Sequence, residues 1–196
     1  MHIAEGVLSL PVLVTGGAVA ALGTAVGLRH LDADTIPRAG VVSAALFAAS
    51  LIHVRLGASS LHLVLNGVAG LLLGSAVFPA FLVSLFLQAV LFQFGGLLVL
   101  GVNTAVMACS GFAAGMAARF LLRRGTSAFV AGCIAGGGGL LGAALLAAAA
   151  LAASGEAFGA GARLLLVAHL PLAAVEAAVG GGVCTLLLRR FPDLWQ

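Results

Sequence analysis

The sequence is a succession of apolar runs, most of them long enough to cross a lipid bilayer, separated by short polar or glycine-containing breaks. A helical crossing needs about 20 mostly apolar residues, because the hydrocarbon core of a bilayer is roughly 30 Å thick. Charged residues make up only 8% of the chain, against about a quarter in soluble domains. Too few polar groups remain to cover a water-exposed surface, so the sequence predicts an all-α integral membrane protein.

Seven apolar segments predict about seven transmembrane helices that form a single membrane domain over residues 1–196. The segments lie at about residues 7–28, 39–56, 61–73, 77–94, 97–122, 127–153 and 164–188. The third segment is short for a full crossing. We expect it to be tilted, or preceded by non-helical backbone, which is tolerated at membrane depth only where protein buries it or where it lines a polar cavity.

Small residues at four-residue spacing predict where helices pack closely. In the first segment these residues are Gly17, Ala21 and Ala25, and in the second they are Ala45 and Ala49. Both packing within the chain and docking of a partner subunit would use such surfaces.

The first apolar run is predicted to be retained rather than removed as a signal peptide. Glu5 is the only charge ahead of the run, whereas a signal peptide carries positive charge there. The run also continues to about Leu28, which is long enough to span the bilayer.

The arginines predict the orientation of the chain, because positive residues favour the cytoplasmic side. With seven crossings and the N-terminus outside, only Arg55 and Arg163 lie at outer ends. The cytoplasmic ends then carry Arg29, Arg38, Arg119, Arg123, Arg124, Arg189 and Arg190. We therefore expect an outer N-terminus and a cytoplasmic C-terminus. The net charge of +3 is interpreted as a consequence of this topology and not as a sign of nucleic-acid binding.

The first two residues, Met1 and His2, suggest a metal site. A chain that begins in this way offers the α-amine, the amide nitrogen of His2 and the His2 imidazole, which can close two fused chelate rings around one divalent ion. A second histidine would complete four nitrogens in a plane, an arrangement that suits Ni(II), Cu(II) and some Co(II) sites. His62 is the candidate, because the predicted topology puts it on the same outer side as the N-terminus. The alternative for His62 is an ordinary buried histidine bonded to a carbonyl.

Other polar residues near the outer helix ends could complete a pocket. Ser60 and Asn66 flank His62 and could fix the tautomer of its imidazole. Asn103 and Thr104 lie near the start of the fifth segment, where they could line the same pocket or cap the helix.

His169 and Glu176 are seven residues apart, so they share one face of the last predicted helix, with Pro171 between them as a predicted kink. A carboxylate inside a membrane is costly and indicates a functional or a paired role. Both a hydrogen bond between helices and a contact with metal remain open for this pair.

Motifs for several chemistries are absent from the sequence. It contains no HExxH, GxSxG or Walker A motif, and the glycines at 136–139 lie in an apolar run, so they are interpreted as packing residues. No catalytic residues are predicted, and ATP hydrolysis would need separate subunits. The single cysteines Cys109, Cys133 and Cys184 are interpreted as small buried residues.

Several motifs together resemble the CbiM/NikM family, the substrate-binding membrane (S) components of energy-coupling factor (ECF) transporters for cobalt and nickel. The resemblance covers essentially the whole chain. It is carried by residues 1–6 (MHIAEG), 59–67 (SSLHLVLNG) and 100–104 (LGVNT), and by His169, Pro171 and Glu176. The motif around His62 departs from another common family pattern at the second histidine, so a preference between nickel and cobalt is not carried over.

This resemblance implies a seven-helix fold in which an added N-terminal helix delivers the tip of the chain to a pocket near the outer face. It implies Ni²⁺ or Co²⁺ as the transported substrate, with no permanently bound cofactor. The implied ligands are the Met1 amine, the His2 amide and imidazole, and His62. The implied partners are a transmembrane coupling (T) subunit, two ATPase (A) subunits and a small accessory membrane protein, in the plasma (inner) membrane of a prokaryote.

Two alternatives belong to other functional classes. The first is a membrane-embedded metalloenzyme that uses His53, His62, His169 and Glu176. The second is a self-sufficient divalent-metal carrier or channel, for which the odd number of predicted spans and the lack of an evident repeat are unfavourable.

Overall fold

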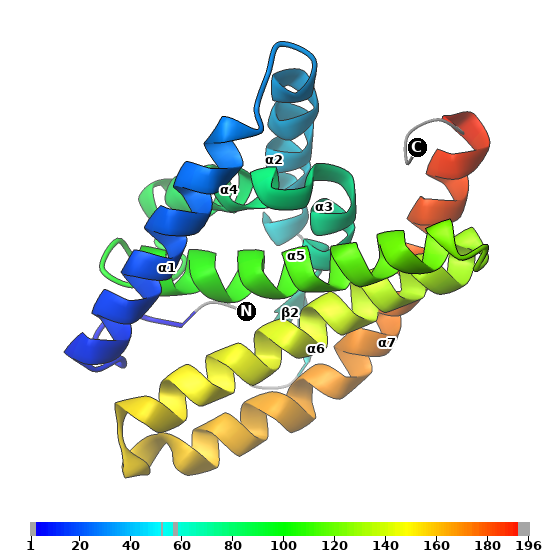
Figure 1. Cartoon of the computed structure of the whole chain (residues 1–196). Helices are drawn as coiled ribbons and strands as arrows, with labels where there is room; N and C mark the ends of the chain where they lie inside the picture. The colour runs from blue at the N-terminus through cyan, green and yellow to red at the C-terminus, as the bar shows by residue number, and fades with distance from the viewer. Residues whose placement is uncertain (1–2, 52, 57–58, 192–196) are drawn as a thin grey trace.

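The computed structural model describes residues 3–51, 53–56 and 59–191, and only the backbone of residues 53–56 and 59–61. Within these residues the chain is helical apart from one short hairpin (Figure 1). The helices are α1 (Leu10–Arg29), α2 (Thr35–Leu51), α3 (Asn66–Leu73), α4 (Val77–Phe92), α5 (Leu100–Arg123), α6 (Ala128–Ser154) and α7 (Gly159–Arg190), with 3-10 turns η1 (Gly74–Ala76) and η2 (Glu156–Phe158). Strands β1 (His53–Leu56) and β2 (Ser59–His62) pair antiparallel, with His53 opposite His62.

Five helical segments of the described chain are long and apolar enough to cross a membrane. They are α1, Asn66–Phe92, α5, α6 and Glu156–Arg190, and α2 is a shorter apolar helix. The prediction of an all-helical, multi-pass membrane protein is therefore confirmed. The count of seven helical spans is not, because α3 has eight residues, about 12 Å of helix at 1.5 Å per residue, and cannot cross alone.

Helix α2 lies earlier in the chain than predicted. It begins at Thr35, with Pro37 in the first turn, where a helix tolerates proline. The Asp32 carboxylate accepts hydrogen bonds from the Thr35 N–H at 2.8 Å and from its hydroxyl at 2.7 Å, and these bonds lower the pKa of Asp32. The predicted extension of this helix to residue 56 is wrong, because residues 53–56 pair with residues 59–62 in the hairpin.

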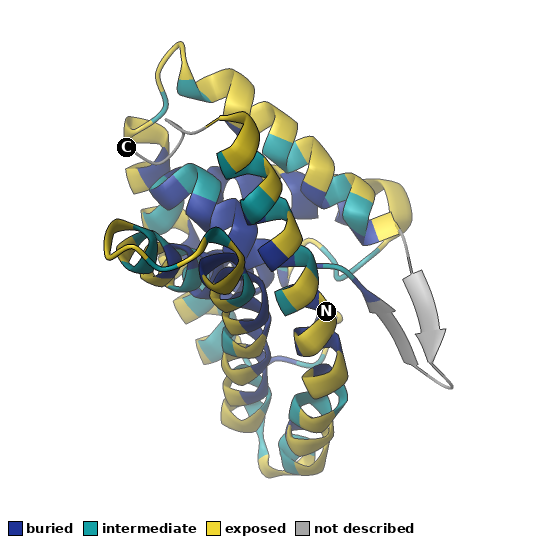
Figure 2. Ribbon diagram, turned by 90° about the vertical axis from the view of Figure 1, so that its right-hand side faces the viewer, coloured by how far each residue is buried: buried dark blue, intermediate teal, exposed yellow. Residues whose placement is uncertain are grey.

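The predicted close-packing face of the first helix is wrong at two of its three residues. Gly17 lies against Gly101 of α5, where an added Cβ would collide with the Gly17 backbone, but Ala21 and Ala25 are exposed. Gly16, Gly23 and Gly27 also touch neighbouring segments. A Cβ added at these three positions would run into Val102, Phe78 and Pro79 respectively. Helix α1 therefore packs on α5 and on the start of α4, and most of its remaining surface is apolar and exposed (Figure 2).

Helices α6 and α7 pack through glycine. A Cβ at Gly136 would collide with the backbone of Glu176, and Gly132 lies against the backbone of Gly180. The interpretation of glycines 136–139 as packing residues is confirmed for Gly136, Gly137 and Gly139, whereas Gly138 is exposed. Close approach of small residues is the usual way in which helices associate inside a bilayer.

Helix α3 lies in the middle of the fold, against α5 and α6. Its Gly67 abuts the Ala135 carbonyl of α6, and its Gly70 abuts the Gly111 carbonyl of α5. It runs in the same direction as α5, since Asn66 meets Gly111 and Gly70 meets Gly115. Gly74 follows its last residue, and its φ of 57° turns the chain toward α1. There Ser75 Oγ lies 3.1 Å from Nδ1 of His30.

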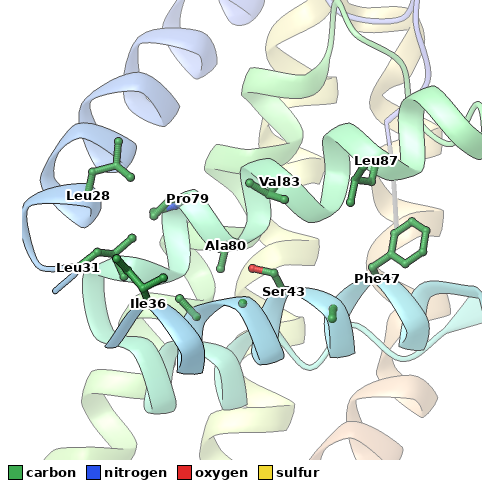
Figure 3. Close-up of a pocket in the computed structure, with 12 residues that line it drawn as sticks. Leu28, Leu31, Ile36, Ser43, Phe47, Pro79, Ala80, Val83 and Leu87 are labelled. Atoms are coloured by element: carbon green, nitrogen blue, oxygen red, sulfur yellow. The ribbon is translucent and has the colours of Figure 1, made fainter. Parts of the chain in front are cut away.

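Helix α4 then runs beside α2 in the same direction (Figure 3). Pro79 lies at the Ile36 end of α2, and the ring of Phe92 is 5.8 Å from that of Phe47 at the other end. A groove of about 450 Å³ separates the two helices. The side chains that line it are apolar apart from Ser43, so it offers nothing to a metal ion.

Candidate metal-binding site

The N-terminal arm, residues 3–9, is tied to α5 by the side chain of Asn103. The amide Nδ2 donates to the carbonyl of Ile3, and Oδ1 accepts from the N–H of Ile3, both at 3.1 Å. A primary amide thus pairs with both backbone groups of one residue, and both residues are buried. Asn103 was predicted to line the pocket or cap its helix, and the structure assigns it this backbone clamp.

Two further hydrogen bonds hold the arm. Glu5 Oε1 accepts from the N–H of Leu98 at 2.9 Å, across Gly96, where a Cβ would collide with the Glu5 side chain. The N–H of Ser9 donates to Ser154 Oγ at 3.1 Å, so the start of α1 lies beside the end of α6.

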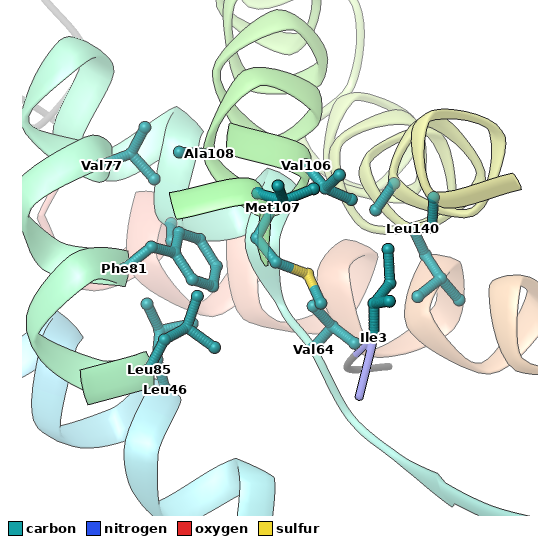
Figure 4. Packing of buried hydrophobic residues seen from close by; sticks show 14 of the residues in the cluster. Ile3, Leu46, Val64, Val77, Phe81, Leu85, Val106, Met107, Ala108 and Leu140 are labelled. Carbon is teal, nitrogen blue, oxygen red and sulfur yellow. The ribbon is translucent and has the colours of Figure 1, made fainter. Parts of the chain in front are cut away.

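The clamp brings the start of the described chain to the segment that follows His62. The side chain of Ile3 belongs to the same buried cluster as Val64, Met107 and Leu140 (Figure 4). Met1 and His2, the predicted chelating residues, lie outside the described residues.

His62 ends strand β2 and is buried. Its Nδ1 donates to the carbonyl of Leu63 at 3.1 Å. Because a carbonyl oxygen can only accept, this bond places the ring proton on Nδ1 and the lone pair of the neutral imidazole on Nε2. Ser60, predicted to help fix this tautomer, lies in β2, where only its backbone is described.

Non-helical backbone follows His62, and a carboxylate satisfies it. Non-helical backbone was one of the two expectations for the third segment, but it was expected before residue 61 and extends to Leu65. Leu65 adopts a left-handed conformation with φ 55°, which is uncommon for a residue other than glycine. The N–H groups of Val64 and Leu65 both donate to the carboxylate of Glu176 on α7, including a 3.0 Å bond from Leu65 to Oε2. Glu176 is completely buried. Its predicted paired role is thus a bond to backbone at the start of α3.

Asn66 joins α3 to its neighbours rather than orienting the imidazole. Its Nδ2 donates to Ser110 Oγ on α5 and to the carbonyl of Gly139 on α6, both at 2.9 Å. Its Oδ1 is buried and has no hydrogen-bond partner among the described residues.

Arg119 also contacts α3, which the sequence did not predict. Its guanidinium donates twice to the carbonyl of Leu71, at 2.7 and 2.9 Å, near the end of α3. Helix α3 therefore lies between a carboxylate at its N-terminus and a guanidinium at its C-terminus, the arrangement that a helix dipole favours. Its position, one helical turn before the paired Arg123 and Arg124 and inside an apolar helix, was the available signal.

Thr104 and His169 are buried, as a pocket role would require, but their described contacts are local. His169 Nδ1 donates to the carbonyl of Leu165 at 2.7 Å, one turn earlier in α7. The Thr104 hydroxyl has no hydrogen-bond partner in the part of the chain that the structure describes. Helix α7 continues through Pro171 without a break in its helical assignment.

The described residues alone do not gather three or more His, Cys, Asp or Glu side chains into a group that could hold a metal ion. The described part of the candidate site is thus one histidine, His62, and an arm whose first described residue, Ile3, shares a buried cluster with Val64.

Comparison with known proteins supplies the family. A family model described as the cobalt uptake substrate-specific transmembrane region, CbiM, matches residues 2–194. The chain belongs to this family. The predicted resemblance is therefore confirmed, and the CbiM family makes the chain a membrane protein of metal transport.

Relatives of known sequence agree with this. The chain is 42% identical to a Haemophilus influenzae protein named "Putative metal transport protein", over 99% of this chain and 96% of that one. It is 33% identical to the cobalt transport protein CbiM of Sorangium cellulosum, over 99% and 94%. It is 31% identical to CbiM of Geobacter sulfurreducens, over 99% of this chain and 61% of that protein.

Two solved structures share the fold. One is described as a transition metal transporter, with a TM-score of 0.81, 26% identity, and coverage of 98% of this chain and 95% of that one. The other is a truncated transition metal transporter, with a TM-score of 0.81, 27% identity, and coverage of 97% and 99%.

Proposed function

We propose that this CbiM family member is the substrate-capture component of an ECF-type importer for Ni²⁺ or Co²⁺. In this proposal the ion is held near the outer face by the Met1 amine, the amide and imidazole of His2, and the imidazole of His62. Met1 must be the first residue of the mature chain, and its amine must be unblocked. The metal is transported substrate, and no permanent cofactor is required.

The observation that carries the proposal is the clamp between Asn103 and Ile3. It fixes the residue that follows Met1-His2 in the buried cluster that also contains Val64, two residues after His62. The hydrogen bond from Nδ1 to Leu63 puts the lone pair of His62 on Nε2, as a metal ligand needs. The described residues do not group His62 with His169 and Glu176, so a metalloenzyme centre built from those residues has no support in this part of the chain.

The packing supports seven crossings, with the third made of two pieces. Helices α2 and α4 run side by side in the same direction, so the chain must return between them. The non-helical residues 63–65 followed by α3 supply this return, which reaches Gly74 near Arg119 and the end of α1. The third crossing in this proposal is part non-helical and part helical. The buried Glu176 carboxylate and the Arg119 guanidinium bond polar groups of its backbone, as chain at membrane depth requires.

The same arrangement supports an outer N-terminus. The start of α1 lies beside the end of α6, and the end of α1 lies beside η1. Seven of the nine arginines then fall at the second of these two ends, which the positive-inside rule assigns to the cytoplasm of a prokaryotic cell. We propose one membrane domain that works with a coupling subunit, two ATPase subunits and a small accessory membrane protein. The exposed Ala45 of α2 is part of a candidate docking surface.

Metal binding by the purified protein tests the proposal. The protein needs an authentic N-terminus, and binding of Ni(II) and Co(II) is measured by competition with a chromophoric chelator. We expect His2→Ala to abolish binding and His62→Ala to weaken it at least tenfold, since each removes a ligand. His30→Ala is the matched control, because His30 is exposed at the opposite end of α1 and should leave affinity unchanged.

Two outcomes would contradict this proposal. If His2→Ala and His62→Ala both bind like the wild type, the site lies elsewhere. If His30→Ala loses as much affinity as His62→Ala, the effect of the histidines is not specific to the outer end.

A further inference from the structure

One peptide unit connects a buried carboxylate to His62. The N–H of Val64 donates to Glu176 Oε1, and the carbonyl of Leu63, on the same peptide group, accepts from His62 Nδ1 at 3.1 Å. The contacts therefore run in series from the α7 carboxylate, through the Leu63–Val64 peptide, to the imidazole. An amide that donates to a carboxylate becomes a stronger acceptor at its own carbonyl, because hydrogen bonds in a chain polarise one another.

We infer that Glu176 is a positioning residue for His62, acting through the Leu63–Val64 peptide, an inference that rests on the proposed metal-binding function. The carboxylate fixes the plane of that peptide, and the peptide carbonyl then sets the tautomer and direction of the imidazole. Metal-binding histidines commonly donate their second ring nitrogen to a carboxylate or a backbone carbonyl. Here both groups are present, with the carbonyl in direct contact and the carboxylate behind it.

The backbone next to this peptide needs such a support. Leu65 holds a left-handed conformation, which is strained for a residue with a side chain. The N–H groups at the start of α3 have no acceptor within the helix. Glu176 accepts from both Val64 and Leu65, so it holds the strained residue and its neighbour together.

The apolar grooves, the cysteines and Arg119 have no comparable connection to His62 among the described contacts. The apolar grooves between helices have no described occupant, and Cys109, Cys133 and Cys184 stand singly. Arg119 supports the far end of α3 and touches neither Val64 nor the Leu63 carbonyl among its hydrogen bonds. Among the described residues, Glu176 is the charged side chain that hydrogen-bonds directly to the backbone of Val64 and Leu65, just after His62.

A double-mutant cycle tests the inference with Ni(II) as the probe and the full chain with an authentic N-terminus. We expect Glu176→Gln to weaken Ni(II) binding about tenfold, within the 10- to 100-fold range typical of groups behind a metal ligand. In the His62→Ala background the same substitution should cost less than about twofold, because the residue through which Glu176 acts is gone. A role confined to stability would instead cost the same factor in both backgrounds, and this result would overturn the inference.

The visible spectrum of bound Ni(II) is the second readout. The ligand-field band of Glu176→Gln should shift toward that of His62→Ala, because a displaced imidazole leaves the coordination plane. Glu156→Gln is the matched control, since Glu156 is exposed at the start of η2 and should change neither affinity nor spectrum. An unshifted band with weakened binding would overturn the positioning role.

Hydrogen exchange of the wild-type protein tests the same contacts without a substitution, so the test does not depend on a variant that folds. The Val64 and Leu65 amides should exchange at least about 100-fold more slowly than in an unstructured peptide, because both donate to a buried carboxylate. Exchange at the unprotected rate would overturn the inference without any substitution.

The two proposals fail in different ways. If His62→Ala weakens binding while Glu176→Gln keeps both affinity and spectrum, the positioning role is wrong and the metal site stands. If His62→Ala binds Ni(II) like the wild type, both proposals are wrong.

Discussion

The two halves of the proposed site are supported in opposite ways. The N-terminal arm is held by hydrogen bonds from a few side chains, chiefly Asn103 and Glu5. Helix α3, which follows His62, is held by close backbone packing and by polar groups at both ends. Residues 66–71 of α3 are all buried, whereas residues 4–6 of the arm are exposed.

This difference separates binding from folding. Substitutions that remove the side-chain anchors of the arm should change the affinity for metal and largely spare the fold, because residues 4–6 of the arm are exposed. Substitutions in α3 should change the fold first, since its glycines touch the backbones of α5 and α6. The predictions below test that separation, beginning with the largest effect.

Gly67→Ala should be severely destabilising. The added Cβ would collide with the carbonyl of Ala135, and neither backbone can move without displacing α3 from α6. Overpacking of this kind costs about 1–3 kcal/mol and more where backbone is struck. The thermal midpoint in detergent and the yield of monodisperse protein measure it. Gly17→Ala in α1 is the control, because a Cβ there meets nothing within 4 Å, and an equal loss in both variants would show that the collision at Gly67 is not the cause.

Asn103→Leu should weaken Ni(II) binding and largely spare the fold. It removes two hydrogen bonds to the backbone of Ile3, each worth about 1 kcal/mol, so the loss is about 2 kcal/mol, or roughly thirtyfold in affinity. Chelator competition measures the affinity, and thermal unfolding measures the fold. Wild-type affinity in this variant would show that the clamp does not place the chain terminus.

Glu5→Ala should have a smaller effect in the same direction. It removes the acceptor for the Leu98 N–H at an exposed position, where such bonds contribute about 0.5–1 kcal/mol, or roughly threefold in affinity. The same competition assay measures it. A loss of affinity larger than that of Asn103→Leu would contradict this prediction, because it would make Glu5 the more important anchor of the arm.

Asp32→Asn should have the smallest effect, because Asp32 lies at the opposite end of α1. Hydrogen bonds from Thr35 lower the pKa of Asp32 below its ordinary 3.8, so their stabilisation is present above that pH and is lost as the pH falls below it. The variant should bind Ni(II) normally and show a slightly flatter loss of thermal stability below about pH 3.8. Weakened metal binding in this variant would show that the Asp32 end of α1 affects the metal site, which the hydrogen bonds of Asp32 do not predict.

The sequence carries the fold class because the composition leaves a chain of this kind no soluble alternative. The short third segment and its non-helical approach were also predictable, since residues 57–60 break the run and too few apolar residues follow. The end of α2 was not predictable, because residues 53–56 become a strand only by pairing with residues 59–62.

The site was predictable where it depends on residue type and not where it depends on contact. His62 and Asn103 stand out by residue type. In the structure His62 donates to the Leu63 carbonyl just before α3, and Asn103 bonds the backbone of Ile3. Ala21 and Ala25 of the face predicted for α1 are exposed, because the neighbour that a helix meets decides which of two adjacent stripes is buried. Arg119 was missed because its acceptor is a carbonyl on another helix.

The central claim is that the first residue of the chain is itself a ligand. The most direct measurement is the Ni(II) affinity of a protein that carries one additional glycine before Met1, compared with the authentic N-terminus. The extension moves the amine out of register and leaves every side chain present. We predict at least a hundredfold loss of affinity and loss of the planar Ni(II) spectrum, because both chelate rings depend on that amine. Equal affinity and an unchanged spectrum in the extended protein would contradict the account.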